Sequence, residues 1–213
     1  KIVEVEVVKE VEVEVEKYVE VDKIVEKIVE VEVEKIVEVE APAPQGGTLR
    51  VGMTGELKTM DPHMTTLGVF WHTIKFNVFS TLIEVDADVN YVPDLATSWE
   101  FTDDATMVLQ LREGVTFHDG KAFTAEDAKF SIERVTSPDS GSVWGAQVPA
   151  LKSVDVLGSH ELQIQCESAC PALETSLLFV DIMSEETADG AANNPIGTGP
   201  FKFKEWVTND HWS

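Results

Sequence analysis

The sequence of 213 residues has few basic side chains. It contains 16 Lys and Arg against 39 Asp and Glu, which gives a formal net charge of −23. A protein that binds nucleic acid must neutralise phosphates with basic residues, and an anionic membrane surface selects for the same residues. The composition therefore argues against both nucleic acid and an anionic lipid surface as the main partner.

Long apolar runs are also missing, so no segment is predicted to span a bilayer, and no signal peptide is visible. Because the sequence starts at Lys1, without Met and already inside a repeat, we expect the true N-terminus to lie further upstream. Only two cysteines occur, Cys166 and Cys170. They either form one small disulfide in an oxidising compartment or remain buried thiols. The short spacing favours thiols, whereas Pro171 permits the turn that a disulfide needs.

Motifs for catalysis and metal binding are lacking as well. The sequence has no G-x-S-x-G nucleophile motif, and Asp119 and Asp127 fit a turn and a helix cap better than a catalytic carboxylate pair. None of the histidines has the paired spacing of a metal site; they are His63, His72, His118, His160 and His211. We therefore expect no enzyme activity, no cofactor and no metal site.

Residues 1–40 form a low-complexity segment in which Val and Ile alternate with Glu and Lys. VEVEVE has the period of a strand, whereas KIVEKIVE has the spacing of a coiled coil. We expect a helical, self-associating stalk, with an extended charged tether as the alternative. Residues 41–47, rich in Pro and Gly, form a linker and mark the predicted domain boundary.

The next stretch, residues 46–71, organises the rest of the chain. Alternation of Leu49, Val51 and Met53 predicts a strand at residues 48–54. Gly55 and Asp61-Pro62 then break regular structure, and a small polar run follows at residues 65–68. Such a loop suits an extended polar ligand, or it merely connects a strand to a helix.

Helical spacing of Phe70, Ile74 and Val78 predicts a helix at residues 70–79. A second helix is predicted at residues 125–135, with Thr124 as N-cap and Asp127 completing a capping box. Its buried stripe is predicted to be Ala125, Ala128, Ile132 and Val135. Strands are predicted at residues 81–85, 99–102, 106–112, 151–157 and 161–166, and the alternation of FKFKEW predicts one at 201–206. A short helix is predicted at residues 172–178.

The order of four motifs resembles a known family: GGTLRVGMTGELKTMDPH, VPDLATSWEF, LREGVTFHDGKAFTAEDAKFSIERV and NPIGTGPFKFKEW. Together they are similar to the peptide-binding solute-binding proteins of ABC importers, which include dipeptide, oligopeptide and nickel binders. The resemblance implies an α/β fold: the first lobe of a two-lobed, class II periplasmic-binding-protein-like structure that closes by hinge motion. It places the core sheet in residues 48–81 and 190–213, with 48–54 beside 195–206, and a β-rich inserted subdomain in 82–189. It also implies that the chain is an N-terminal fragment.

The resemblance further implies where ligand contacts lie. Thr65, Thr66, Leu67 and Gly68 correspond to a loop whose backbone and hydroxyl groups pair with a peptide main chain. Trp144 corresponds to an aromatic wall, with ordinary packing as the alternative for this residue. We interpret Glu56, which is also near the loop, as a solvated acid.

The implied function is that of an extracytoplasmic substrate-binding component of an ABC importer. Its partners would be a peptide or similar small solute and the transmembrane permease subunits. Its location would be the periplasm or the cell surface, attached to the membrane by a lipid anchor that this chain does not show. The alternative is a structural, oligomeric cell-surface protein in which the stalk self-associates and the binding fold is degenerate.

Overall fold

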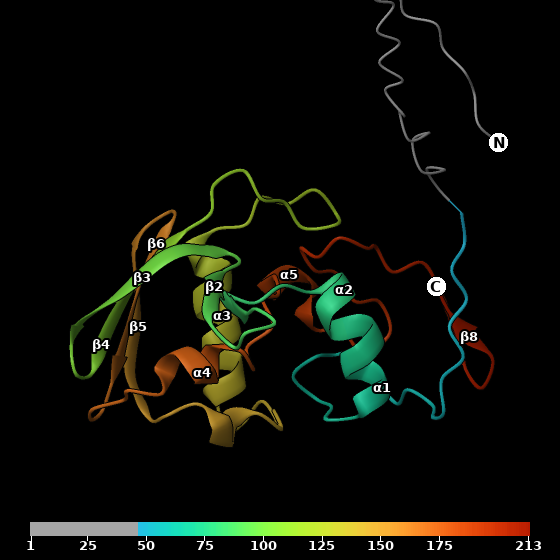
Figure 1. The fold of residues 1–213 in the computed structure, drawn as a ribbon, viewed down its shortest axis with the longest axis horizontal. Coiled ribbons are helices and arrows are strands. Elements are labelled where there is room, and N and C mark those ends of the chain that lie inside the picture. Colours follow the sequence, from blue (N-terminus) through green and yellow to red (C-terminus); the bar gives the residue numbers. More distant parts are fainter. Residues whose placement is uncertain (1–46) are drawn as a thin grey trace, which may run out of the picture. The chain divides into compact units, whose positions relative to one another are not determined.

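The computed structural model describes residues 47–213 (Figure 1), so the predicted stalk and most of the linker lie outside the described residues. Residues 52–213 form one unit, and residues 47–51 belong to another. No helix among the described residues is long and apolar enough to cross a membrane.

A four-stranded antiparallel sheet dominates this unit, with strand order β3-β4-β6-β5. The strands are β3 (Ala96–Asp103), β4 (Thr106–Leu111), β5 (Leu151–Gly158) and β6 (Glu161–Cys166). Alternation places the apolar residues of the two central strands on the buried face: Met107, Leu109, Leu111, Leu162, Ile164 and Cys166. The β3–β4 hairpin turns at Asp103, whose Oδ1 accepts the backbone N–H of Ala105 at 2.8 Å.

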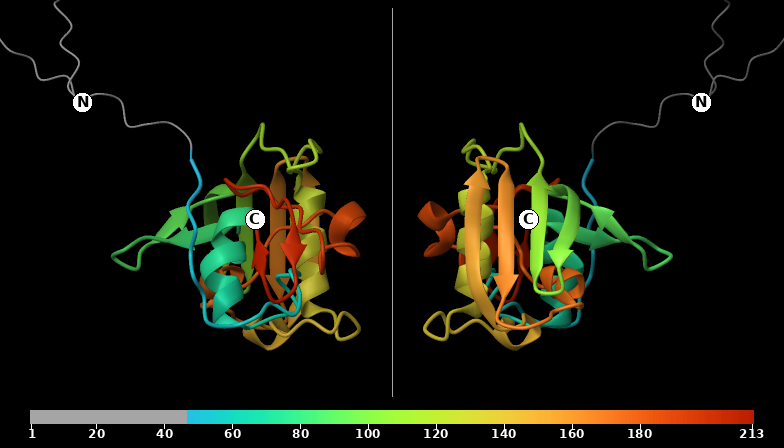
Figure 2. Two further views of the ribbon diagram at one scale, coloured as in Figure 1. Left: turned by 90° about the vertical axis from the view of Figure 1, so that its right-hand side faces the viewer. Right: turned by 90° about the vertical axis from the view of Figure 1, so that its left-hand side faces the viewer.

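Helix α3 (Ala125–Thr136) covers one face of this sheet, as Figure 2 shows. The predicted capping box is confirmed, with Oδ2 of Asp127 accepting the backbone N–H of Thr124 at 3.0 Å. The four apolar residues of the predicted stripe are all buried in the core shared with the sheet. Helical periodicity and one local cap therefore suffice to define this element.

A second helical segment covers residues 68–78. It consists of α1 (Gly68–Phe70), a π-helical turn (Trp71–Lys75) and α2 (Phe76–Val78). Phe70, Ile74 and Val78 are buried on one side, as predicted. They belong to a second apolar cluster, against which Phe130 of α3 also packs. Helix α3 thus lies between two cores, one shared with the sheet and one shared with this helix.

Short elements complete the unit. The hairpin of β1 (Ile83–Val85) and β2 (Tyr91–Pro93) turns at residues 86–90 around Oδ1 of Asp86. A 3-10 turn (Gly145–Gln147) follows the loop after α3. Helices α4 (Leu173–Leu177) and α5 (Glu185–Ala188) follow the sheet, and β7 (Trp206–Val207) pairs with β8 (His211–Trp212) at the end of the chain.

Two predicted strands are wrong. Residues 48–54 form no strand. The segment 201–205 is not a strand either. The backbone N–H of Phe201 donates to Asn77 O at 2.9 Å, and those of Lys204 and Glu205 donate to Ser213 O. The expected pairing of 48–54 with 195–206 in one sheet involves residues of both units and stays a prediction.

Cys166 and Cys170 form a disulfide, so the thiol interpretation is wrong. The chain turns between the end of β6 and α4, where the backbone N–H of Cys170 donates to Asp104 O at 2.9 Å. This turn brings the two cysteines together in spite of their short separation.

The motif Gly197-Thr198-Gly199 closes the C-terminal end of α2. The backbone N–H of Gly199 donates to Val78 O at 3.0 Å, and His118 bonds through its backbone N–H to Gly197 O and through Nε2 to Gly199 O. A Cβ on Gly197 would overlap the backbone carbonyl of Val78. The glycines are needed for this close approach of two backbones.

We expect Gly197→Ala to lower the free energy of unfolding by about 3 kcal/mol, because the new methyl group forces two backbones apart. Urea denaturation followed by circular dichroism measures the change. Gly190→Ala is the matched control, since its Cβ would meet only ordinary van der Waals contact. Equal stability of the two variants would contradict this packing.

Reduction of the disulfide should lower the free energy of unfolding by about 2 kcal/mol, because the bridge closes only a short loop in the unfolded chain. Urea denaturation with and without reductant measures this loss. The double variant Cys166→Ala/Cys170→Ala serves as control and should not respond to reductant. A native chain with the same midpoint in both conditions would rule out a stabilising bridge.

Candidate functional site

The loop that leads to the predicted ligand-facing residues is held by a buried ion pair. Nη1 and Nη2 of Arg134 in α3 donate to Oδ1 and Oδ2 of Asp61 at 3.1 and 2.6 Å. The two side chains are 15% and 6% exposed. Oδ1 of Asp61 also accepts the backbone N–H of His63 at 3.0 Å, which closes the turn at residues 61–64. Two parallel hydrogen bonds between a guanidinium and a carboxylate fix orientation as well as distance.

His63 extends this arrangement across the interior. Its Nδ1 lies 2.8 Å from Nη1 of Arg134, and its Nε2 lies 2.9 Å from the backbone oxygen of Asp181. Because a guanidinium only donates hydrogen bonds, Nδ1 must accept, and Nε2 carries the proton that is donated to the carbonyl. Burial, followed by the positive charge of Arg134, lowers the pKa of His63 to about 4. His63 is therefore neutral at pH 7.

Lys75 and Asp181 form a second buried ion pair next to His63. Nζ of Lys75 lies 2.7 Å from Oδ2 of Asp181, and both side chains are almost fully inaccessible. Burial raises the pKa of Asp181 to about 6, although the charge of Lys75 acts in the opposite direction. Oδ1 of Asp181 has no hydrogen-bond partner among the described residues. Lys75 lies in the π-helical turn, a type of irregularity that is frequent at functional sites.

The predicted site residues at 65–68 follow this turn directly. Thr65 is buried, and its Oγ1 accepts the backbone N–H of Leu67 at 3.2 Å. Thr66, Leu67 and Gly68 are exposed. The backbone N–H of Thr66 donates no hydrogen bond within the described part of the chain. The segment thus presents an exposed backbone between a fixed turn and the start of α1.

Trp144 lies against the same turn. Its Nε1–H donates to the backbone oxygen of Pro62 at 3.0 Å, and its ring stacks on Phe179 with the centroids 5.3 Å apart. The backbone N–H of the preceding residue, Val143, donates to His63 O at 3.0 Å. The structure therefore connects Trp144 to the turn that precedes residues 65–68. It also gives the indole a packing role, so its role in binding stays a prediction.

Sequence reasoning missed Arg134, Lys75 and Asp181. One signal was present in α3: Asp127, Ser131 and Arg134 follow helical spacing and form a polar stripe that is largely buried. Polar residues at core spacing indicate a buried polar contact. The distant partners of Arg134 and Ser131, which are Asp61 and the backbone of Met183, are too far away in sequence to be inferred from this spacing.

Glu56 is not simply a solvated acid. Its Oε1 accepts the Nε1–H of Trp206 at 3.3 Å and the backbone N–H of Asn209 at 3.0 Å. The carboxylate therefore anchors the β7–β8 hairpin, and the interpretation of Glu56 as a purely solvated residue is corrected.

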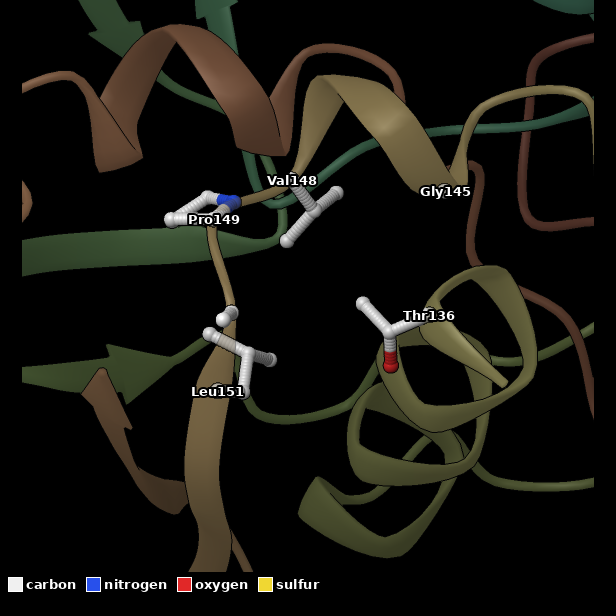
Figure 3. Close-up of a pocket in the computed structure, with 6 residues that line it drawn as sticks. Thr136, Gly145, Val148, Pro149 and Leu151 are labelled. Atoms are coloured by element: carbon white, nitrogen blue, oxygen red, sulfur yellow. The ribbon is translucent and has the colours of Figure 1, made fainter. Parts of the chain in front are cut away.

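A pocket of about 420 Å³ lies between the end of α3 and the start of β5. Figure 3 shows Thr136 on the helix facing Val148 and Leu151 across it. Gly145 also lines this pocket, directly after Trp144, but none of the five predicted site residues does. The pocket and the predicted ligand-facing loop are therefore different features of the molecule.

The comparisons with known proteins agree with the motif order. The family described as bacterial extracellular solute-binding proteins, family 5 Middle, matches residues 90–213, more than half of the chain. The chain belongs to this family. A putative ABC transporter peptide-binding protein of Brucella ovis is 30% identical over 186 residues, which cover 80% of this chain and 35% of that protein. The oligopeptide-binding protein AppA of Bacillus subtilis is 31% identical over 175 residues, covering 76% of this chain and 32% of AppA.

Solved structures of the family have the same fold. AppA from Bacillus subtilis, in complex with a nonapeptide, matches with a TM-score of 0.65 and 28% identity over 72% of this chain and 33% of AppA. NikZ from Campylobacter jejuni, in complex with Ni(L-His), matches with a TM-score of 0.65 and 30% identity over 72% of this chain and 32% of NikZ. These matches confirm the predicted class II binding-protein fold. The chain spans about a third of the length of these relatives.

The neutral state of His63 makes stability depend on pH in a defined direction. Its pKa is lower in the folded chain, at about 4, than the ordinary value of 6.5, so the unfolded chain binds the extra proton between these values. The contribution of the neutral His63 side chain to the free energy of unfolding is therefore fully present above pH 6.5 and is lost as the pH falls towards 4. The carboxyl group of Asp181 has a raised pKa of about 6, so the folded chain binds its proton before the unfolded chain does as the pH falls. Its protonation therefore raises the free energy of unfolding, which is opposite to the effect of His63.

The variant His63→Gln separates the two contributions, because glutamine keeps one acceptor and one donor but does not titrate. We expect the stability advantage of the native chain over this variant to shrink by about 3 kcal/mol between pH 7 and pH 4. Urea denaturation at intermediate pH values measures the difference. An advantage that stays constant across this range would show that His63 is not a buried neutral imidazole.

Proposed function

We propose that this chain is part of the substrate-binding component of an ABC importer. It would bind a peptide or similar small solute outside the cytoplasm and deliver it to the transmembrane permease subunits. The observation that carries this proposal is its similarity, over most of its length, to proteins named as peptide-binding proteins of ABC transporters. We also propose that it binds without chemical turnover and is held at the membrane by an anchor outside the described residues.

The geometry of the loop at residues 65–68 supports recognition of the solute through its main chain. Thr65, Thr66, Leu67 and Gly68 carry no charge, and the last three are exposed. A backbone N–H and a hydroxyl pair with the amide groups of a peptide whatever its side chains are. Trp144, fixed near the same turn, would supply apolar contact to those side chains. We therefore propose these five residues as ligand contacts.

The test is isothermal titration calorimetry of the full chain that the gene encodes, with short peptides and with Ni(L-His) as separate titrants. Peptide binding at micromolar or lower concentration supports the proposal. If only Ni(L-His) binds, the ligand is a metal chelate and not a peptide. If neither titrant produces heat, the proposed function is contradicted.

Trp144→Ala should weaken binding of the best peptide by about tenfold, because an aromatic anchor is lost. Trp144→Phe keeps a ring that can stack on Phe179 and should retain most of the affinity. Thermal unfolding of both variants reports the packing role separately. An affinity of Trp144→Ala within about twofold of the native value would remove Trp144 from the site.

A further inference from the structure

We propose that Arg134 is the positioning residue of the ligand-binding site, holding the loop at residues 65–68 and Trp144 in a fixed relation to each other. This role rests on the proposed function. Arg134 lies near the C-terminal end of α3, and its hydrogen bonds to side chains of the described residues go to Asp61, His63 and Met183. It acts through the turn at residues 61–64.

The guanidinium makes three hydrogen bonds to this turn, two to the carboxylate of Asp61 and one to Nδ1 of His63. The carboxylate is itself bonded to the backbone N–H of His63. On its far side, the imidazole donates to the backbone oxygen of Asp181. The turn is therefore held on both sides. Neither the carboxylate of Asp61 nor the imidazole of His63 can rotate without breaking a buried hydrogen bond.

The same turn supports both parts of the proposed site. The backbone oxygen of Pro62 accepts the indole N–H of Trp144, and that of His63 accepts the backbone N–H of Val143. Thr65 follows His63 by only two residues. A displacement of the turn would therefore move the aromatic wall and the loop together. Binding groups must be held to within about 0.5 Å by the residues behind them to remain effective.

Arginine is the side chain that this role requires. Its planar fork reaches both oxygens of Asp61 and still offers a donor to His63. A lysine ammonium keeps the charge, and so the ion pair, but cannot hold the carboxylate in a bidentate manner. Arg134→Lys therefore separates positioning from charge pairing, whereas removal of the charge would leave Asp61 buried without a partner.

The experiment measures hydrogen exchange of the indole N–H groups in the full 213-residue chain by ¹⁵N NMR, without any solute. Trp144 reports the site. Trp99 is the internal reference, because its Nε1–H donates to Glu174 at 2.6 Å, away from the turn. Trp144→Phe and Trp99→Phe assign the two signals. Lys129→Gln is the matched control, since it removes an exposed ion pair with Glu133 from the same helix.

In Arg134→Lys, we expect exchange of the Trp144 indole to be about tenfold faster, with Trp99 unchanged, because only the turn loosens. Lys129→Gln should leave both rates at the native values. Unchanged exchange of Trp144 in Arg134→Lys would overturn the proposal. An equal acceleration of both indoles would also overturn it, because that result indicates a general loss of stability.

Asp61→Asn provides a second test if Arg134→Lys does not fold. It keeps the shape of the side chain but weakens the hold of Arg134, so the same selective effect on Trp144 is expected. Absence of that selectivity would overturn the proposal.

Peptide titration of the same variants in the full gene product separates this proposal from the proposed function. A loss of affinity of about tenfold in Arg134→Lys supports both. If the native protein binds no peptide while the exchange result is as expected, the proposed function fails and the positioning of the turn stands.

Discussion

The arrangement of the proposed site depends on one buried contact, the pair formed by Asp61 and Arg134. Two charges removed from water are tolerated only when their remaining donors and acceptors are also bonded. Here the backbone N–H of His63 donates to the carboxylate of Asp61, and Nδ1 of His63 accepts from the guanidinium of Arg134. The pair therefore specifies the position of an irregular loop against a regular helix, which apolar packing alone would leave less well defined.

Helix α3 shows how much of the fold and of the candidate site could be predicted from the sequence. Its length, capping box and apolar stripe are local properties, because each depends on residues three or four apart on one helix, and all were predicted correctly. Its polar stripe is equally periodic. What the sequence could not supply was the partner of Arg134, since Asp61 lies 73 residues away and only the tertiary fold brings the two together.

The two wrong strands show the complementary limit. Alternation indicates that a segment could have one buried face, but a strand exists only where another backbone pairs with it. In 201–205, the backbone donors of Phe201, Lys204 and Glu205 bond to the end of α2 and to Ser213. The disulfide was uncertain for a related reason, because the turn between Cys166 and Cys170 depends on a contact with Asp104 in a distant hairpin.

Three of the proposed binding residues, Thr66, Leu67 and Gly68, are exposed and uncharged, so their own side chains cannot fix them in space. The buried polar contacts behind them can, and the choice of side chains fits this task. At neutral pH, only an uncharged imidazole at position 63 has an acceptor for Arg134 and a donor for the Asp181 carbonyl within one rigid ring. A site that reads a solute through backbone groups has little side-chain chemistry of its own. Its selectivity must then depend on how exactly those groups are held, and that places the functional constraint on residues that do not touch the solute.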